Sequence, residues 1–237
     1  MGDKMHIQSA FDRDLERIQA RIMKMGGLVE EAILDSAKSL ETRDEELAET
    51  VRRKDAQIDA LEEQINQEAA RVIALRAPTA VDLRLVLSVI KISSNLERIG
   101  DYAKNLAKRT AVLSRMAPVG DGAAALRRMG REVEVMLRDA LDAFVQRDAD
   151  LARDVINRDV DIDQMYNALF REFLTHMMED PRSISACMHL HFIAKNIERA
   201  GDHVTSIAEQ VVFLVTGEKP DEGRRKAALP SLDDSGD

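Results

Sequence analysis

The sequence lacks residues on which several classes of protein depend. Its single cysteine, Cys187, has no partner for an internal disulfide and no cluster with which to bind zinc, which favours a reducing compartment. Tryptophan is absent and only 3% of the residues are aromatic, so large β-sandwiches and barrels are disfavoured. The longest apolar run, 211–215, is far shorter than the roughly 20 residues that span a bilayer. We therefore expect an aliphatic interior, and contact with a membrane only through a partner.

Positive charge is outnumbered by negative charge. The 237 residues include 34 Lys and Arg against 43 Asp and Glu, which gives a net charge of −9. Nucleic-acid binding is disfavoured, because the phosphate backbone is captured by clustered positive charge. Acids and bases are interspersed in residues 1–18, so the apolar segment of a signal peptide is not expected there.

Most of the sequence shows the apolar period of an α-helix. The five prolines stand where long helices would have to stop, and between them apolar residues recur in steps of three and four, the period of an amphipathic helix. A helix of about 35 residues is roughly 50 Å long. Residues 217–237 lose this period and gain proline, glycine and charge, which predicts a disordered tail. We predict an all-α protein with six long helices, near residues 6–41, 44–76, 79–114, 123–146, 148–179 and 182–216.

The chain also repeats itself. Residues 25–59 match residues 129–163 at a constant offset of 104, with thirteen identities. Shared composition alone would give about two or three. At an offset of 101, the segment NLERIGD (95–101) matches NIERAGD (196–202). The sequence therefore predicts two tandem, pseudo-symmetric three-helix bundles, 1–117 and 118–216.

Each half retains two pairs of acids spaced by four residues, and residues i and i+4 share one face of a helix. Hard or borderline cations such as Fe, Mn, Mg or Ca bind several oxygen ligands, and two such helices side by side would offer four carboxylates. The pairs are Asp55/Asp59 and Glu97/Asp101 in the first half, and Asp159/Asp163 and Glu198/Asp202 in the second.

Two structural explanations stay open for these acids. About eight acid–x₃–acid spacings are expected by chance in so acidic a chain, so a single pair is typical of a solvated helix face. Alternatively, Arg98 and Arg199, which follow the motif glutamates, hold the carboxylates in salt bridges. Asp35 and Asp139 also match across the repeat, and we rank them only as outer residues of a metal site.

No pattern indicates covalent catalysis. The sequence contains no Gly-x₄-Gly-Lys phosphate loop, no Gly-x-Ser-x-Gly elbow and no Glu-x-x-His pair of a di-iron bundle. His203 follows Asp202 and is at most an outer group, since its match in the first half is Tyr102.

Gly100 and Gly201 each cost a helix about 1 kcal/mol relative to Ala. Their repetition predicts the close approach of a neighbouring helix, or else of a ligand.

These motifs together resemble the PhoU family of phosphate-signalling proteins. The resemblance covers nearly all of residues 6–216. It is carried by Asp-x-x-Ile-Asp on the second helix of each repeat and Asn-φ-Glu-Arg-x-Gly-Asp on the third, where φ is apolar. The segment APTAVDLR (77–84) is also similar to that family. The second half departs at DPRSIS (180–185), which has no match to Asp82 and Arg84.

The resemblance implies a cytoplasmic protein that is not an enzyme and that reaches the membrane only through partners. These partners would be the ATPase of a phosphate ABC transporter and a sensor histidine kinase, and the protein would restrain phosphate uptake and the phosphate-starvation response. The eight acids named above would hold metal ions, which we expect to be Fe, Mn, Zn or Mg, and a homodimer is the expected assembly. The competing functions are a carboxylate-bridged multinuclear metalloenzyme and a helical scaffold whose acids are solvated.

Overall fold

The computed structural model describes residues 2–218. Over this range the chain forms six α-helices and one short 3-10 helix, without a strand, which confirms the all-α prediction. The predicted tail lies outside the described residues from 219 onward. The elements are α1 (Gly2–Thr42), α2 (Glu45–Arg76), α3 (Ala80–Leu113), α4 (Gly122–Gln146), α5 (Ala149–Glu179), η1 (Pro181–Ser183) and α6 (Ile184–Thr216).

Repeated Arg-Asp pairs make two of the helix connections. Arg43 and Arg147 both adopt the left-handed conformation, with φ of 56° and 57°, and each ends a helix. Asp44 and Asp148 follow them and accept hydrogen bonds from backbone N–H groups in the first turns of α2 and α5. The last helix begins two residues later than predicted, because Pro181 opens the 3-10 turn instead.

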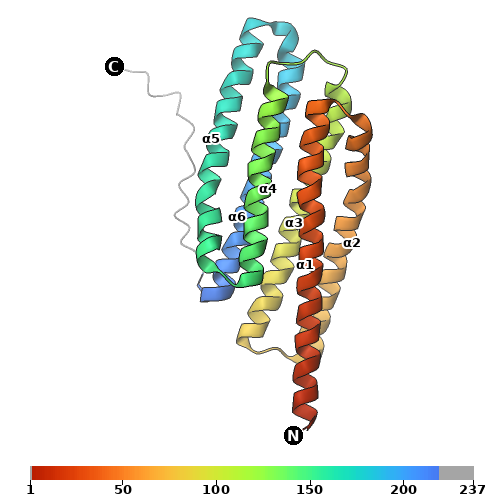
Figure 1. Ribbon diagram of the computed structural model, residues 1–237, viewed down its shortest axis with the longest axis vertical. Helices are drawn as coiled ribbons and strands as arrows, with labels where there is room; N and C mark the ends of the chain where they lie inside the picture. The colour runs from red at the N-terminus through yellow and green to blue at the C-terminus, as the bar shows by residue number, and fades with distance from the viewer. Residues whose placement is uncertain (1, 219–237) are drawn as a thin grey trace, which may run out of the picture.

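The six helices form two three-helix units that pack against each other (Figure 1). Within each unit all three helices are in contact, and the units meet where α1 packs on α4 and α3 packs on α6. The outer helices are α2 and α5, which lie at opposite sides of Figure 1. One buried apolar cluster runs through both units. None of the helices described in residues 2–218 has the length and apolar character needed to cross a bilayer.

The contact between α1 and α4 is reciprocal. A Cβ atom added to Gly26 would lie 2.3 Å from Leu141 Cδ1, and one added to Gly130 would lie 3.5 Å from Ala37 Cβ. The repeat offset of 104 relates Gly26 to Gly130 and Ala37 to Leu141, so the two contacts are copies of each other. The helices therefore cross antiparallel about an approximate two-fold axis, as identical surfaces do in a symmetric dimer.

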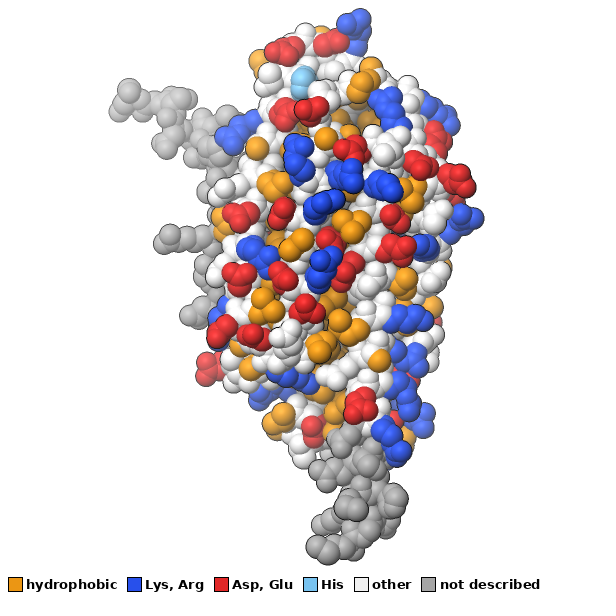
Figure 2. All heavy atoms as spheres, viewed as in Figure 1, with side chains coloured by type: hydrophobic (Ala, Val, Ile, Leu, Met, Phe, Trp, Pro, Cys, Tyr) orange, Lys and Arg blue, Asp and Glu red, His pale blue; other side chains and the backbone are white. Residues whose placement is uncertain are grey.

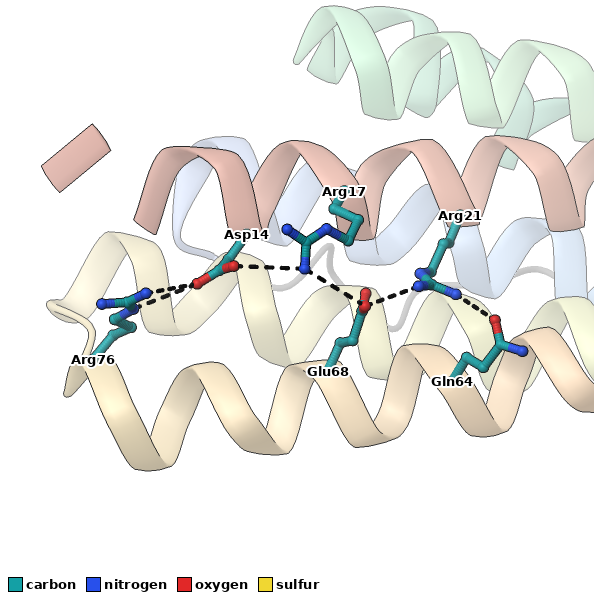
Figure 3. A network of polar contacts seen from close by, with 6 residues as sticks. All are labelled: Asp14, Arg17, Arg21, Gln64, Glu68 and Arg76. Carbon is teal, nitrogen blue, oxygen red and sulfur yellow. Dashed lines mark hydrogen bonds and ion pairs between the residues drawn. The ribbon is translucent and has the colours of Figure 1, made fainter. Parts of the chain in front are cut away.

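A polar network joins the N-terminal half of α1 to the C-terminal half of α2 (Figure 3). Arg21 Nη2 lies 2.9 Å from Glu68 Oε1, and Arg76 Nη2 lies 3.1 Å from Asp14 Oδ2. Arg17 stands between them, 3.8 Å from Asp14 and 4.0 Å from Glu68. Apart from Arg17, these charged side chains are only 23–30% exposed, and ion pairs near the surface contribute about 0–1 kcal/mol each, so the network mainly aligns the two helices.

Candidate metal centres

The structure gathers the eight predicted carboxylates into two clusters. The first cluster lies on α2 and α3, and the second lies on α5 and α6. Acids of one helix lie close to the other helix in both clusters: Lys104 Nζ of α3 contacts Asp55 Oδ2 of α2, and a Cβ atom added to Gly201 of α6 would lie 3.7 Å from Asp159 Oδ1 of α5. Since the described parts of α2 and α5 make no contact, the clusters occupy opposite sides of the molecule (Figure 1). The first cluster is Asp55, Asp59, Glu97 and Asp101, and the second is Asp159, Asp163, Glu198 and Asp202.

The two motif glycines let the helices of each cluster approach. A Cβ atom on Gly100 would lie 3.0 Å from Ile58 Cδ1, and one on Gly201 would lie 3.4 Å from Ile162 Cγ2. Both glycines are buried, and both isoleucines match across the repeat. A neighbouring helix, and not a ligand, therefore explains the repeated glycine. The same approach brings the carboxylate of Asp55 within 3.9 Å of the added Cβ position on α3.

The acids of the first cluster repel one another. Partial burial and the nearby Asp101 raise the pKa of Glu97 to about 7, although Arg98 opposes the shift. Arg98 Nε lies 3.7 Å from Glu97 Oε2, but the arginine side chain is 61% exposed and is therefore well screened by solvent. Partial burial, followed by the charge of Asp55, also raises the pKa of Asp59.

A lysine supplies positive charge to the first cluster. Lys104 Nζ makes an ion pair with Asp55 Oδ2 and lies 3.6 Å from Asp101 Oδ1. The salt-bridge explanation named Arg98, whereas Lys104 is the residue that joins carboxylates of both helices. Sequence reasoning missed it, although its position three residues after Asp101 places the two on one helix face.

The second cluster has different neighbours. The Thr205 hydroxyl donates a hydrogen bond of 3.1 Å to Asp159 Oδ1, and Lys195 Nζ lies 2.7 Å from Glu198 Oε2. Partial burial, followed by the charge of Asp159, raises the pKa of Asp163. Thr205 and Lys195 were also missed by sequence reasoning.

The donor atoms suit a hard or borderline cation, since all eight predicted ligands are carboxylates. Glu198 is only 8% exposed, and its Oε2 forms an ion pair with Lys195 Nζ at 2.7 Å. Within residues 2–218, however, no three His, Cys, Asp or Glu side chains surround one point closely enough to hold a metal ion. Metal binding would therefore require carboxylate side chains to rotate toward a shared ion.

Two of the outer residues predicted for these sites, His203 and Asp139, have partners elsewhere. His203 Nδ1 lies 2.7 Å from Asn95 Oδ1, and its ring centre lies 5.7 Å from that of Tyr102, so His203 joins α6 to α3. Asp139 pairs with Arg158 at 2.5 Å. These contacts connect helices and do not by themselves complete a metal site.

A hollow of about 220 Å³ opens at the end of the molecule where α3 is connected to α4. Its lining includes Leu40, Leu113 and Leu190, with Glu41 and Arg43 among its polar residues. None of the eight carboxylates lines it. This hollow therefore gives the clusters no enclosed substrate cavity of the kind that a metalloenzyme would use.

Comparison with known proteins gives concordant results for sequence and fold. The family model described as the PhoU domain matches residues 22–110 and again residues 126–211. The phosphate-specific transport system accessory protein PhoU homolog of Zymomonas mobilis is 47% identical over 227 residues, which cover 95% of each chain. The homolog of the same name from Caulobacter vibrioides is 44% identical over 214 residues, 90% of this chain and 93% of that protein.

Solved structures agree with these matches. The crystal structure of PhoU from Pseudomonas aeruginosa superposes with a TM-score of 0.85 at 41% identity, covering 88% of this chain and 100% of that one. The phosphate transport system regulatory protein PhoU from Streptococcus pneumoniae superposes with a TM-score of 0.80 at 33% identity, covering 89% and 99%.

Proposed function

The chain belongs to the PhoU family, and on that premise we propose that it is an accessory regulator of phosphate transport. The observation that carries the proposal is likeness along nearly the whole chain to proteins named as accessory to a phosphate-specific transport system. The finer role that we propose is negative: the protein restrains phosphate uptake and the phosphate-starvation response when phosphate is plentiful.

We further propose that the protein acts by binding and not by catalysis. It would work in the cytoplasm as an adaptor, and as a homodimer, between the transporter ATPase and a sensor histidine kinase. Helices about 50 Å long offer broad surfaces for such partners. On the face seen in Figure 2, acidic and basic side chains are interspersed with apolar ones, a mixture that suits contact with another protein.

Metal ions form the second part of the proposal. The carboxylate clusters are the part of the described surface where Fe, Mn, Zn or Mg would bind, because carboxylates already drawn together repel unless positive charge offsets them. A bound ion would supply that charge and would join two helices of one bundle. The clusters would then tune the charge of the surface that a partner meets.

A deletion strain tests the regulatory role. We expect a reporter of phosphate-scavenging genes to be active in phosphate-rich medium when the gene and every paralogue are deleted, and to be repressed again when this chain is restored. Continued repression in the deletion strain would contradict the proposal. Purification of the tagged chain should also recover the transporter ATPase or the kinase.

Surface variants make the binding test sharper. Met188 and Phe192 lie one turn apart on α6 and are 41% and 48% exposed, and Arg109 of α3 stacks 4.7 Å from the Phe192 ring centre. Large exposed apolar side chains often mark contact surfaces. We expect the double variant M188S/F192S to recover less of the partner than V145S, a control that removes one exposed apolar residue from α4. Equal recovery would exclude this face.

A further inference from the structure

Exposed apolar side chains gather near the connection between α5 and α6. On α6, Ile184, Met188 and Phe192 are spaced by four residues and therefore share one face of the helix. Leu174 of α5 and Val112 of α3 are also large, apolar and exposed. All five side chains are 40–48% exposed. Several such side chains in one place are typical of a surface that contacts another molecule.

Val112 lies beside this face of α6. Contacts between α3 and α6 run in opposite order along the two helices: Asn95 bonds to His203, and Arg109 packs on Phe192. The two helices are therefore antiparallel. Val112 follows Arg109 by about one turn, so it lies beside the turn of α6 that precedes Phe192.

Leu174 lies on the other side of the same face. Thr205 of α6 bonds to Asp159 of α5, and the ring centres of His191 and Phe170 are 5.3 Å apart, so these helices are also antiparallel. Leu174 follows Phe170 by one turn and lies beside the turn of α6 that precedes His191. The exposed side chains therefore form one surface, which we call the α6 patch: Val112, Leu174, Ile184, Met188 and Phe192.

Two of the helices that carry the patch are positively charged there. Residues 102–113 of α3 and 184–197 of α6 include three lysines and one arginine but no aspartate or glutamate. The chain as a whole has a net charge of −9, so these segments are opposite to it in sign. Lys104 and Lys195 pair with acids of the carboxylate clusters, whereas Arg109 lies at the edge of the α6 patch.

Two rings of α6 orient Arg109. Its Nη1 donates a hydrogen bond of 3.0 Å to His189 Nδ1, and its Cζ lies 4.7 Å from the centre of the Phe192 ring. Neither ring supplies a full negative charge, and the bond to His189 uses one of the five N–H donors of a guanidinium. A carboxylate suits such a group, since arginine binds it with two parallel hydrogen bonds.

We propose that the α6 patch docks an amphipathic helix of a partner protein, whose apolar side chains cover the patch and whose acid pairs with Arg109. The proposal rests on the proposed function, because it states which kind of surface on the transporter ATPase or the kinase this chain meets. Ile184 and Phe192 are about 12 Å apart along α6, a length that apolar residues at positions i, i+4 and i+7 of a helix match. A lipid surface suits the patch less well, because Arg109 is held against two rings instead of extending toward head groups.

Photo-crosslinking from inside the patch identifies what covers it. The change Phe192→p-benzoylphenylalanine is made in the full chain, and cells are irradiated in phosphate-rich medium. We expect a crosslinked product with the transporter ATPase or the kinase. Mass spectrometry should place the crosslink in a helical segment that has an acid within one turn of its apolar residues. Val145→p-benzoylphenylalanine, at an exposed apolar position of α4, is the matched control and should give no such product.

Charge reversal tests the pairing with Arg109. Isothermal titration calorimetry with the partner identified by the crosslink should show binding weakened at least tenfold by Arg109→Glu. Arg128→Glu reverses an exposed charge on α4 and should bind like the wild type. Because Arg109 also joins α3 to α6, Arg109→Gln, which removes the charge alone, is a second variant, and circular dichroism establishes that each is folded. Exchange of the partner's acid for lysine should restore binding to Arg109→Glu.

Four results would overturn the proposal. They are a crosslink to a second copy of this chain, a crosslink to phospholipid, a partner segment without an acid, and unchanged binding of both Arg109 variants. The phosphate reporter judges the regulatory role separately. A chain that restores repression but gives no protein crosslink from residue 192 would refute the docking site and leave the proposed regulation intact.

Discussion

Adjacent glycines of α1 allow the crossing of α1 and α4 to be tested by a pair of matched substitutions. A Cβ atom on Gly26 would lie 2.3 Å from Leu141 Cδ1, well inside the 3.5–4.0 Å at which carbon atoms attract. Leu141 is 1% exposed and packed in the core, so either its side chain or the helices must move. At Gly27, an added Cβ atom would meet nothing within 4 Å among the described residues.

The magnitudes follow from two opposing effects. Replacing glycine by alanine inside a helix stabilises it by about 1 kcal/mol at either position. Forcing an extra methyl group into a packed core costs about 1–3 kcal/mol, and this applies only at Gly26. We therefore expect Gly27→Ala to stabilise the protein by about 1 kcal/mol. Gly26→Ala should be neutral or should destabilise it by up to about 2 kcal/mol.

Urea and thermal unfolding followed by circular dichroism measure both variants. The helix-propensity gain is common to the two, so the difference between them isolates the steric cost at about 1–3 kcal/mol. For a chain of this size, each kcal/mol shifts the melting temperature by about 2–4 °C. Gly130→Ala is a further control, because its Cβ atom would meet Ala37 at an ordinary 3.5 Å. Equal shifts for Gly26→Ala and Gly27→Ala would refute the close crossing.

Three further predictions concern the acids and the helix contacts. Because the pKa of Glu97 is raised from 4.5 to about 7, the folded state binds more protons than the unfolded state between these values, so the unfolding free energy should fall as pH rises through that window. Urea titrations of chelator-treated protein should show this fall reduced in Glu97→Gln, and an unchanged pH profile would contradict it. Asn95→Ala removes the partner of His203 and should cost about 1–3 kcal/mol of unfolding free energy. The exposed Asn105→Ala should cost much less, and similar losses would argue against the contact between the two halves. Asp44→Ala removes a helix cap and should lower the stability by about 1 kcal/mol, measured by thermal unfolding. No change in the melting temperature would show that the cap is dispensable.

Much of the fold could be predicted because its signals are local. Proline positions and the three-to-four residue period depend on neighbours along the chain, and the helices end close to the predicted residues. The repeated Arg-Asp pairs at two helix connections are local features as well, since each lies in a single turn, although the sequence analysis did not identify them. The contacts between the units could not be predicted, because the period shows which face of a helix is apolar but not which helix packs against that face.

The candidate sites could also be predicted only where their features lie within one helix. Spacing by four residues placed both acids of each pair on one face, and the repeat indicated that two pairs belong together in each half. The sequence suggested Arg98 as the countercharge, because it is adjacent to Glu97. The structure instead uses Lys104, whose ammonium reaches Asp55 on another helix. Adjacency in sequence is a poor guide here, because successive residues on a helix point in different directions.

The sequence by itself determined the six helices, the two-fold repetition and the acidic faces, since each of these depends on residue identity and spacing within one helix. Only the tertiary structure decided that Gly26 faces Leu141, that His203 bonds to Asn95, and that Lys104 enters one carboxylate cluster while Thr205 enters the other. Those pairings join residues far apart in the chain, and they arise from how the helices pack.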